Sequence, residues 1–218
     1  MKMCIRDRFS PEAIDKKQSA AIREKLGVAE DDTLVCFCGR LGQEKNVDTL
    51  VKNWAQTIKP EDKLKLLILG GGPALEELRQ QVQALGMEKL VFFTGMMKHE
   101  ELPAYYGACQ LYITASLSDT NSISMKEGMA AGLPVIHIYD PLNAGQVIEG
   151  VNGFIYHNAN EMYTVLKRYQ AMNPEEKQKL THSVLDSVKV YSSEALAKNL
   201  LKIYEKAIAE NREKPLRQ

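Results

Sequence analysis

The sequence has few cysteines, few aromatic residues, no long hydrophobic run and no excess of charge of either sign. Of its 218 residues, 4 are cysteine and 7% are aromatic, and 28 basic residues balance 28 acidic ones. Four scattered cysteines are too few for a disulfide framework, which favours a reducing, cytoplasmic compartment. A net charge of zero gives no general attraction to nucleic acid or to an anionic membrane. No apolar stretch approaches the roughly 20 residues that cross a bilayer, and the N-terminus lacks the apolar core of a signal peptide.

What the chain does contain is typical of a globular α/β protein. Hydrophobic residues make up 44% and charged residues 26%, which excludes disordered, collagen-like and low-complexity classes. Short apolar runs alternate with amphipathic segments, and this alternation predicts βαβ units. We expect a Rossmann-like open parallel sheet of about six strands, with helices on both faces and extra helices at the C-terminal end. The expected strands are 33–38, 63–69, 89–93, 111–114, 134–138 and 154–156. The expected helices are 10–26, 46–58, 74–85, 100–108, 122–131, 160–169, one that opens at 173–174, and 194–210.

The N-terminal region carries a helix-start signal after a short segment that fits no element. Ser10 stands where an N-cap is expected, and Pro11 suits the first position of a helix. The predicted division is a lead-in segment and helix over 1–30, a Rossmann-like domain over 31–191, and a C-terminal helix and tail over 192–218. Because an open parallel sheet binds its ligand at the carboxyl ends of its strands, the loops after the strands are the places to look for chemistry.

The first such loop is Gly39-Arg40-Leu-Gly-Gln-Glu-Lys45-Asn, between the first expected strand and a helix. Free N–H groups at a helix N-terminus favour an anion, and Arg40 and Lys45 add two positive charges there. The loop is therefore a candidate phosphate cradle, although it is not a Walker loop, because Gly-x-x-x-x-Gly-Lys-Ser/Thr is absent. An ordinary glycine turn with two solvated charges explains the same spacing.

The second loop, Gly70-Gly-Gly-Pro73, follows the second expected strand. Three glycines let the backbone approach a ligand closely at the start of a helix. The segment does not match Gly-x-Gly-x-x-Gly, because Leu75 stands at the place of the last glycine. A tight turn with a helix-starting proline is the alternative.

The third loop carries Asp119, and the helix after it carries Glu127, eight residues later. Helical spacing places Glu127 beside Ile123, Ala130 and Ala131 on one apolar face. A carboxylate in such a stripe is rarely left unpaired, because burying its charge alone costs several kcal/mol. Two hydroxyl groups of a ligand would satisfy it, and so would a Lys, an Arg or a backbone donor of the protein. The short polar residues of the loop suit sugar hydroxyls and N-capping equally.

Other kinds of site find little support. Cys36 and Cys38 lie on the same face of an expected strand, which predicts two small buried residues rather than metal ligands. No Cys-x-x-Cys and no histidine at ligand spacing is present, so no metal is expected, and His137 on a buried strand is expected in the core. The sequence also lacks a Gly-x-Ser-x-Gly elbow. A response-regulator-like domain would need an Asp after the first strand, where Gly39 and Arg40 stand.

Seven motifs stand in order at the expected strand ends and turns. They are Phe37-Cys-Gly-Arg-Leu-Gly-Gln-Glu-Lys-Asn, Leu69-Gly-Gly-Gly-Pro, Phe92-Phe-Thr-Gly, Glu100-Glu-Leu-Pro-Ala-Tyr-Tyr, Asp119-x7-Glu127, Ala131-Gly-Leu-Pro-Val and Gly150-Val-Asn-Gly-Phe. In this order they resemble glycosyltransferase family 4, specifically the C-terminal, nucleotide-sugar-binding half of a two-domain GT-B enzyme. The resemblance covers roughly residues 31–209. It implies that residues 31–191 form the donor domain of a hexosyltransferase active in bacterial cell-envelope or polysaccharide biosynthesis.

The resemblance also implies roles for individual residues. The reaction would be retaining transfer from a nucleotide-diphospho-sugar, taken to be a UDP-sugar, with no metal or other cofactor. Arg40 and Lys45 match the pair that neutralises the departing diphosphate, Glu127 the acid that binds the ribose hydroxyls, and Asp119 the contact to the donor sugar. The other implied donor-binding positions are Gly39, Gly71 and Gly72 near the nucleotide, Gly95, Met96 and Met97 near the base, and Ser118, Thr120, Asn121, Ser122 and Ile123 at the loop and helix start that hold phosphate.

Three departures from the family pattern matter. Asp119 is one methylene shorter than the usual Glu, and Ser122 replaces a common Gly. The N-terminal acceptor-binding half and its Ile-Pro-Asn-Gly-like linker are absent. We therefore expect a fragment, or one half of a two-chain enzyme, that needs the acceptor half in cis or in trans; any peripheral membrane contact would run through that half. The alternative is a degenerate, non-catalytic half that acts as an interaction module, and nucleotide binding separates the two.

Overall fold

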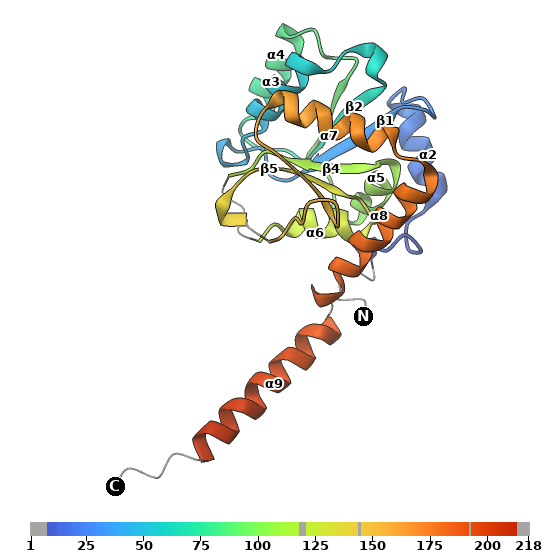
Figure 1. Ribbon diagram of the computed structural model, residues 1–218. Helices are drawn as coiled ribbons and strands as arrows, with labels where there is room; N and C mark the ends of the chain where they lie inside the picture. The colour runs from blue at the N-terminus through green and yellow to red at the C-terminus, as the bar shows by residue number, and fades with distance from the viewer. Residues whose placement is uncertain (1–7, 118–120, 144, 192, 213–218) are drawn as a thin grey trace.

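The computed structural model describes residues 8–117, 121–143, 145–191 and 193–212, and a six-stranded parallel sheet forms its centre (Figure 1). The strands are β1 (Thr33–Cys38), β2 (Leu64–Leu69), β3 (Val91–Gly95), β4 (Leu111–Thr114), β5 (Val135–Ile138) and β6 (Gly153–Tyr156). Their order across the sheet is β3-β2-β1-β4-β5-β6, and every neighbouring pair runs parallel. This is the order of a doubly wound Rossmann sheet, so the predicted α/β fold is confirmed.

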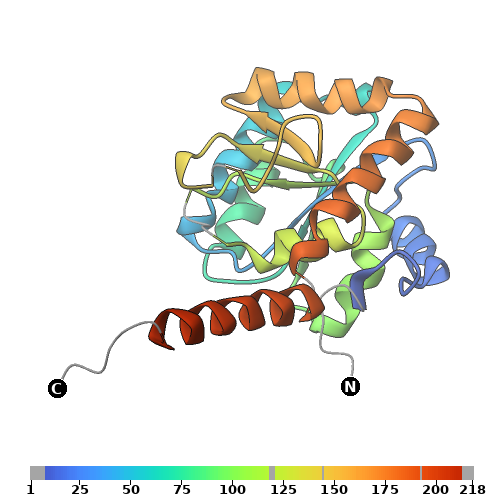
Figure 2. The same ribbon diagram turned by 60° about the horizontal axis from the view of Figure 1, so that its bottom comes forward.

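Helices cover both faces of the sheet. They are α2 (Lys16–Lys25), α3 (Val47–Thr57), α4 (Leu75–Ala84), α5 (Leu102–Ala108), α6 (Ile123–Ala130), α7 (Ala159–Ala171), α8 (Pro174–Ser187) and α9 (Ser193–Arg212). Short 3₁₀ turns are η1 (Gln43–Lys45), η2 (Pro60–Asp62), η3 (His99–Glu101), η4 (Pro141–Asn143) and η5 (Lys189–Tyr191). Helices α3, α4 and α7 pack into one core cluster and α5 and α6 into another, whereas α8 contributes Leu180 to the first cluster and Val184 to the second. Helix α2 lies against α5 (Figure 2).

Strand β1 shows why the sheet is covered on both sides. All six of its residues are buried, and they alternate between the two clusters: Val35 and Phe37 face the first, whereas Leu34, Cys36 and Cys38 face the second. A strand that is apolar throughout suits the middle of a parallel sheet, because neither face meets water. The two cysteines are free, buried and in the same cluster, which confirms that they act as small core residues.

The predicted helix start at Ser10 is wrong. The helix begins at Lys16, where the Asp15 carboxylate accepts hydrogen bonds from the backbone N–H groups of Lys17 and Gln18, at 2.9 and 3.2 Å. A charged carboxylate at the positive end of a helix satisfies two free donors at once. Ser10 instead closes a turn, in which its carbonyl accepts from the N–H of Ala13 at 2.8 Å.

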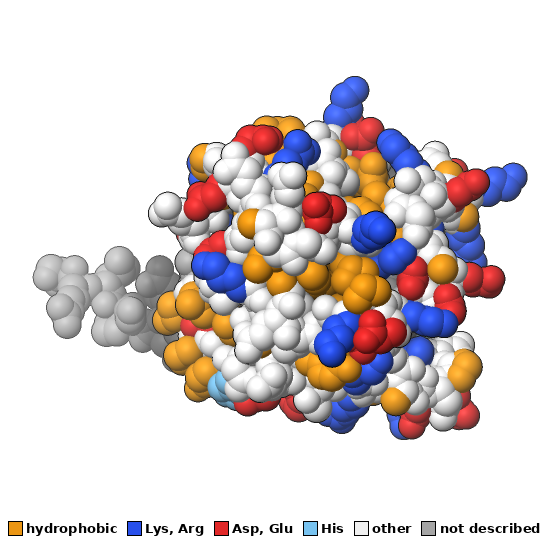
Figure 3. Space-filling view, turned by 90° about the horizontal axis from the view of Figure 1, so that it is seen from above, with side chains coloured by type: hydrophobic (Ala, Val, Ile, Leu, Met, Phe, Trp, Pro, Cys, Tyr) orange, Lys and Arg blue, Asp and Glu red, His pale blue; other side chains and the backbone are white. Residues whose placement is uncertain are grey.

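Helix α9 extends away from the sheet and its covering helices in both ribbon views (Figures 1 and 2). Among its described side chains, Leu200, Leu201, Ile203, Tyr204 and Ile208 are exposed. Elsewhere, on the face seen in Figure 3, the coloured side chains include basic and acidic groups interspersed with apolar ones. Within the described part of the chain, no helix combines the length and the apolar character needed to cross a membrane.

Candidate functional site at the carboxyl edge of the sheet

Strand order defines where a ligand site is expected. Strand β1 lies between β2 and β4. The chain adds β2 and β3 on one side of β1 and then returns to add β4, β5 and β6 on its other side, so the direction of winding reverses between β1 and β4. In doubly wound sheets the crevice for a ligand opens beyond the carboxyl ends of the strands at this switch point. The loop after β1 begins at Gly39, and the loop after β4 leads into α6, which carries Glu127. The sequence motifs after these strands therefore meet at one edge of the sheet.

Backbone hydrogen bonds join the loops after β1 and β2. The N–H of Gly39 donates to Leu69 O at 3.0 Å, and the N–H of Leu41 donates to Gly71 O at 2.9 Å. In return, the N–H of Ala74, at the start of α4, donates to Leu41 O at 3.0 Å. The two candidate phosphate loops therefore form one continuous surface.

Glycine is required at two positions in this surface. Gly70 has φ +126°, and a Cβ there would lie 2.1 Å from the carbonyl oxygen of Gly39. Gly72 has φ +157°, and a Cβ there would lie 2.5 Å from the carbonyl oxygen of Leu41. L side chains rarely adopt these conformations, and the obstructing atoms are backbone atoms that cannot turn aside. Glycine at both positions therefore permits the loops to approach one another.

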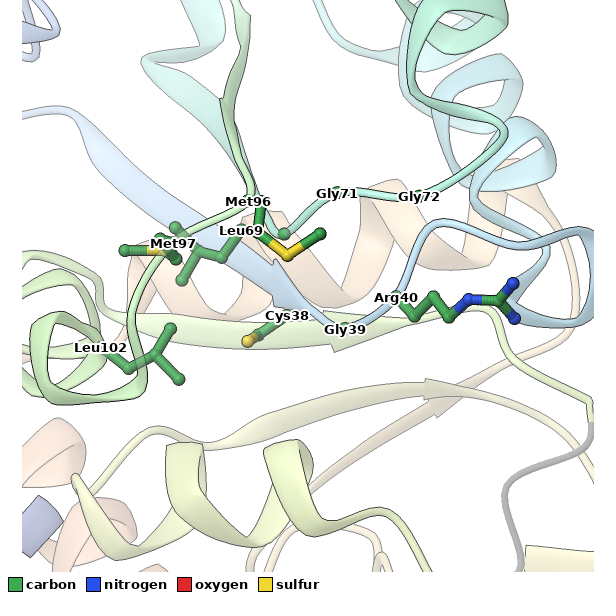
Figure 4. A pocket seen from close by; sticks show the side chains of 10 residues that line it. Cys38, Gly39, Arg40, Leu69, Gly71, Gly72, Met96, Met97 and Leu102 are labelled. Atoms are coloured by element: carbon green, nitrogen blue, oxygen red, sulfur yellow. The ribbon is translucent and has the colours of Figure 1, made fainter.

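A cavity of about 330 Å³ opens over the ends of β1, β2 and β3 (Figure 4). It is lined by Cys38, Gly39, Arg40, Leu69, Gly70, Gly71, Gly72, Met96, Met97 and Leu102. Six of these residues, Gly39, Arg40, Gly71, Gly72, Met96 and Met97, were predicted from sequence. The side chains of Leu69, Met96, Met97 and Leu102 gather toward one end, whereas Arg40 extends to the other. Such a cavity offers an apolar end to a planar ring and a cationic end to an anion.

Three residues of the cavity wall were not predicted, Cys38, Leu69 and Leu102, and Gly70 was expected only as part of the glycine loop. Each has an ordinary structural explanation in the sequence, as the last residue of a strand, a turn glycine or the first residue of a helix. Position at the carboxyl end of a central strand was the available signal for Cys38 and Leu69. Gly95, also predicted, does not line the cavity but forms a β-bridge with Gly70.

The two predicted cations lie on the loop after β1. Arg40 is exposed, and its Nη1 is 3.4 Å from the Glu44 carboxylate four residues later. This pair is solvent-screened and contributes little to stability, so the guanidinium can exchange Glu44 for an anionic ligand. Lys45, half-buried, ends the turn η1, and its N–H donates to Gly42 O at 3.1 Å.

Turn η1 packs against the loop after β4. Asn46 adopts the left-handed conformation with φ 53°, and its side-chain amide donates to Ala115 O at 3.1 Å. Ser116 Oγ donates to Glu44 O at 3.4 Å. Asn46 occupies the predicted N-cap position of α3, but its side chain does not cap the helix, because it makes this bond to the end of β4 instead. Lys45 is thereby placed next to the segment that leads to residues 118–120.

Glu127 is buried in α6, with 5% of its surface exposed. Its carboxylate Oε1 lies 2.7 Å from Nε2 of His99, in the turn η3 after β3. The partners expected from sequence were a Lys, an Arg, a backbone donor or ligand hydroxyls, and this histidine was not among them. Burial raises the pKa of the Cys38 thiol to about 11, and the charge of Glu127 adds to this rise. His99 lies in the chain between Met97 and Leu102, which both line the cavity, so its contact with Glu127 places the carboxylate close behind the cavity wall.

The start of α6 contains three more predicted residues. The Ser122 hydroxyl caps the helix by accepting from the Met125 N–H at 3.4 Å, and the Asn121 side chain accepts from Lys126. Ile123 does not belong to a buried stripe with Glu127, because it is 64% exposed. Ser118, Asp119 and Thr120 lie outside the described residues.

The described ranges contain no group of three or more side chains able to hold a metal ion. His137, on β5, is 4% exposed and bonds through Nδ1 to the carbonyl of Ile138. It is therefore a satisfied core residue, as predicted.

Comparison with known proteins gives a consistent set of matches. The family model of glycosyl transferases group 1 matches residues 18–181. Alpha-monoglucosyldiacylglycerol synthase of Streptococcus pneumoniae is 28% identical over 204 residues, which cover 94% of this chain and 46% of that protein. The Acholeplasma laidlawii protein of the same name is 28% identical over 206 residues, which cover 94% of this chain and 52% of that protein. The chain thus spans about half the length of these curated relatives.

Solved structures share the fold. HepE of Anabaena in complex with UDP-glucose is 21% identical, with a TM-score of 0.75 over 94% of this chain and 55% of that chain. The C-terminal domain of a group 1 glycosyl transferase from Francisella tularensis is 18% identical, with a TM-score of 0.68, and the alignment covers 85% of this chain and 96% of that domain.

Proposed function

Because the chain belongs to the family of glycosyl transferases group 1, we propose that it binds the nucleoside-diphosphate sugar of a retaining hexosyl transfer. The observation that carries this proposal is the cavity at the carboxyl edge of the sheet, with glycine loops on one side and the buried carboxylate of Glu127 behind it. Each part has the chemistry of one part of the donor.

The base fits the apolar end of the cavity, against Met96 and Met97, where flexible thioethers can pack on an aromatic ring. The ribose hydroxyls would donate to Glu127, because a buried carboxylate gains most from donors that replace its lost hydration. Arg40, at the other end of the cavity, and Lys45 would face the diphosphate. The donor would then lie across the ends of β1, β2 and β3.

Catalysis in this proposal is mainly electrostatic. As the bond from the sugar to the diphosphate breaks, negative charge accumulates on the leaving oxygen. The positive charges of Arg40 and Lys45, with the N-terminus of α6, would stabilise that charge. Asp119, the proposed contact to the donor sugar, and its neighbours Ser118 and Thr120 complete the proposed donor set.

We propose UDP-glucose as the donor to test first, with no metal or other cofactor. Two findings support this choice: a structurally similar protein is solved with UDP-glucose, and a relative is named alpha-monoglucosyldiacylglycerol synthase. That name also supports a lipid acceptor and a role in the cell envelope. Because the chain spans about half of this relative, we propose that acceptor recognition needs a second half, in cis or in trans. The free cysteines support a cytoplasmic location.

The proposal is tested by thermal unfolding with UDP. A ligand at 100 times its Kd stabilises the folded state by about 2.7 kcal/mol, which raises the Tm of a domain of this size by roughly 5–10 °C. Glu127→Gln is expected to abolish most of this shift, because it removes the charge that the ribose hydroxyls would bind. Glu88→Gln is the matched control. It makes the same chemical change at an exposed site just before β3, at the amino ends of the strands and so away from the cavity at their carboxyl ends.

An absent shift in the unmodified protein would overturn the donor-site proposal and favour a degenerate interaction module. A shift that Glu127→Gln leaves unchanged would remove Glu127 from the site but would keep the nucleotide in it. Calorimetric titration with UDP and UDP-glucose distinguishes these outcomes directly.

A further inference from the structure

We propose that His99 is a positioning residue for Glu127: its neutral ring, held in one tautomer by Arg8, donates the hydrogen bond that orients the carboxylate toward the ribose of the donor. The inference rests on the proposed function and adds a residue on a different loop. Glu127 follows β4 in the chain, whereas His99 follows β3. The contact therefore joins the turn after β3 to helix α6.

Hydrogen-bond geometry fixes the tautomer. Arg8 Nη1 lies 2.7 Å from His99 Nδ1, and His99 Nε2 lies 2.7 Å from Glu127 Oε1. A guanidinium only donates, so Nδ1 must accept and carries no proton. The ring proton is then on Nε2, and it points at the carboxylate. Arg8, His99 and Glu127 form a chain in which each donor has one acceptor.

An aromatic contact also restrains the ring of His99. The Phe9 ring meets it edge-on, with centroids 5.4 Å apart and planes at 74°, and Phe9 packs in turn against Tyr106 at 5.7 Å. Phe9 is buried, with 1% of its surface exposed, so this wall belongs to the core. The turn that carries His99 is closed by Glu101, whose carboxylate accepts from the Lys98 N–H at 2.9 Å. The backbone of the turn is thus restrained, and the ring, which is 49% exposed, is held on one side by Phe9 and at its two nitrogens by hydrogen bonds.

Orientation matters because Glu127 has few other restraints. Within the described residues, His99 is the hydrogen-bond partner of its carboxylate, although the side chain is only 6% exposed. A carboxylate has about four acceptor positions, so a bond from His99 to Oε1 leaves capacity on both oxygens for a pair of hydroxyl groups. Holding one oxygen stops rotation of the group about its last bond and presents the rest to the ligand. Loss of His99 should therefore weaken ribose recognition and leave base and phosphate binding intact.

The experiment compares two ligands by calorimetric titration: UDP, and 2′,3′-dideoxy-UDP, which lacks both hydroxyls. His99→Ala is expected to weaken binding of UDP about tenfold, as for a lost hydrogen bond to a charged group, and to leave binding of the dideoxy ligand unchanged. His99→Gln should restore most of the affinity for UDP, because its side-chain amide nitrogen reaches the place of the ring Nε2. His99→Asn, whose amide nitrogen is at the place of Nδ1, should not.

Arg8→Ala is a second, independent variant, because Arg8 is exposed and lies outside the proposed donor contacts. It frees the tautomer and should weaken UDP severalfold without affecting the dideoxy ligand. A purely structural role for His99 would weaken both ligands alike and would not distinguish Gln from Asn; that result overturns the inference. So does unchanged UDP binding by His99→Ala, provided that Glu127→Gln still loses it. If the unmodified protein binds no UDP, the proposed function itself fails and this inference fails with it.

Discussion

Cys38 is the most informative side chain for the chemistry of the cavity wall. Burial, with the charge of Glu127 behind it, raises its pKa to about 11, so at pH 8 about one thiol in a thousand is ionised. We expect Cys38 to react slowly with iodoacetamide at pH 8 and more slowly still with UDP bound. Peptide mapping by mass spectrometry measures the rate for each cysteine separately. Labelling as fast as that of an exposed cysteine would show that the cavity is more open or more polar than described.

Gly70 tests whether the loops must touch. Gly70→Ala combines a positive φ with a clash against backbone, and we expect loss of UDP binding together with destabilisation of more than about 1–2 kcal/mol. Gly86→Ala is the matched control, since Gly86 also has a positive φ, +66°, but nothing lies within 4 Å of an added Cβ. The control should lose only the strain energy, measured by urea unfolding, and keep its affinity for UDP. Equal effects of the two substitutions would contradict the role of close approach.

At the scale of elements, one arginine joins α2 to its surroundings. Arg23 Nη1 donates to Ala108 O and to Gln110 Oε1, at 3.0 and 3.1 Å. Its Nη2 donates to Ala29 O and to Asp32 O, at 2.6 and 2.8 Å. One planar group therefore holds the end of α2, the segment before β1 and the segment before β4 together.

Arg23→Lys keeps the charge but loses the planar fork, and a lysine cannot reach all four acceptors. We expect the free energy of unfolding to fall by about 1–3 kcal/mol, because several partly buried oxygens lose their donors. Lys25→Ala, at an exposed position of the same helix, should change it by less than about 0.5 kcal/mol. Urea unfolding of both variants makes the comparison. If Arg23→Lys lowers the free energy of unfolding no more than Lys25→Ala does, water molecules must satisfy the oxygens that the guanidinium contacts.

Strands were more predictable than helix ends. The strands appear within two residues of the predicted starts, since continuous apolar runs such as 33–38 have no alternative in a covered sheet. Helix starts depend on which of several polar residues captures the free N–H groups. Ser10 and Asp15 both suit an N-cap, and the carboxylate of Asp15 takes the position. Asn46 also suits one, but a carbonyl at the end of β4 engages its amide. Such competition is decided by tertiary contacts.

The same distinction applies to the candidate site. The glycine loop that contains Gly71 was predictable because parallel topology brings strand ends together, whereas Met96, after the edge strand β3, was implied by the family resemblance. The contact of His99 with Glu127 was not, because it depends on how the turn η3 lies against helix α6. Nor did helical spacing reveal that Ile123 faces outward. Periodicity predicts which residues share a face of a helix. It does not predict which of them lie at the end of the helix, where a side chain such as Ile123 can be exposed.

At the scale of the whole molecule, α9 stands apart from the packed body. Leu201 and Tyr204 are 60% and 61% exposed, so replacing both with Glu should change the free energy of unfolding by less than about 0.5 kcal/mol. Leu50→Ala, at a fully buried position of α3, should cost about 2–5 kcal/mol. Chemical unfolding followed through the single, buried Trp54 reports on the body of the domain. A large loss in the α9 variant would show that the helix packs on the domain in solution.

The cavity wall has one further property: it is built from a single uninterrupted stretch of chain. Its lining residues begin at Cys38 and end at Leu102, and Glu127 follows only one strand later. Exchange of residues 38–127 between two relatives would transfer the proposed nucleotide pocket as one continuous segment, without touching β5, β6 or the helices after them. Under the proposed function, donor preference would then be exchangeable as one segment, independently of whatever receives the sugar.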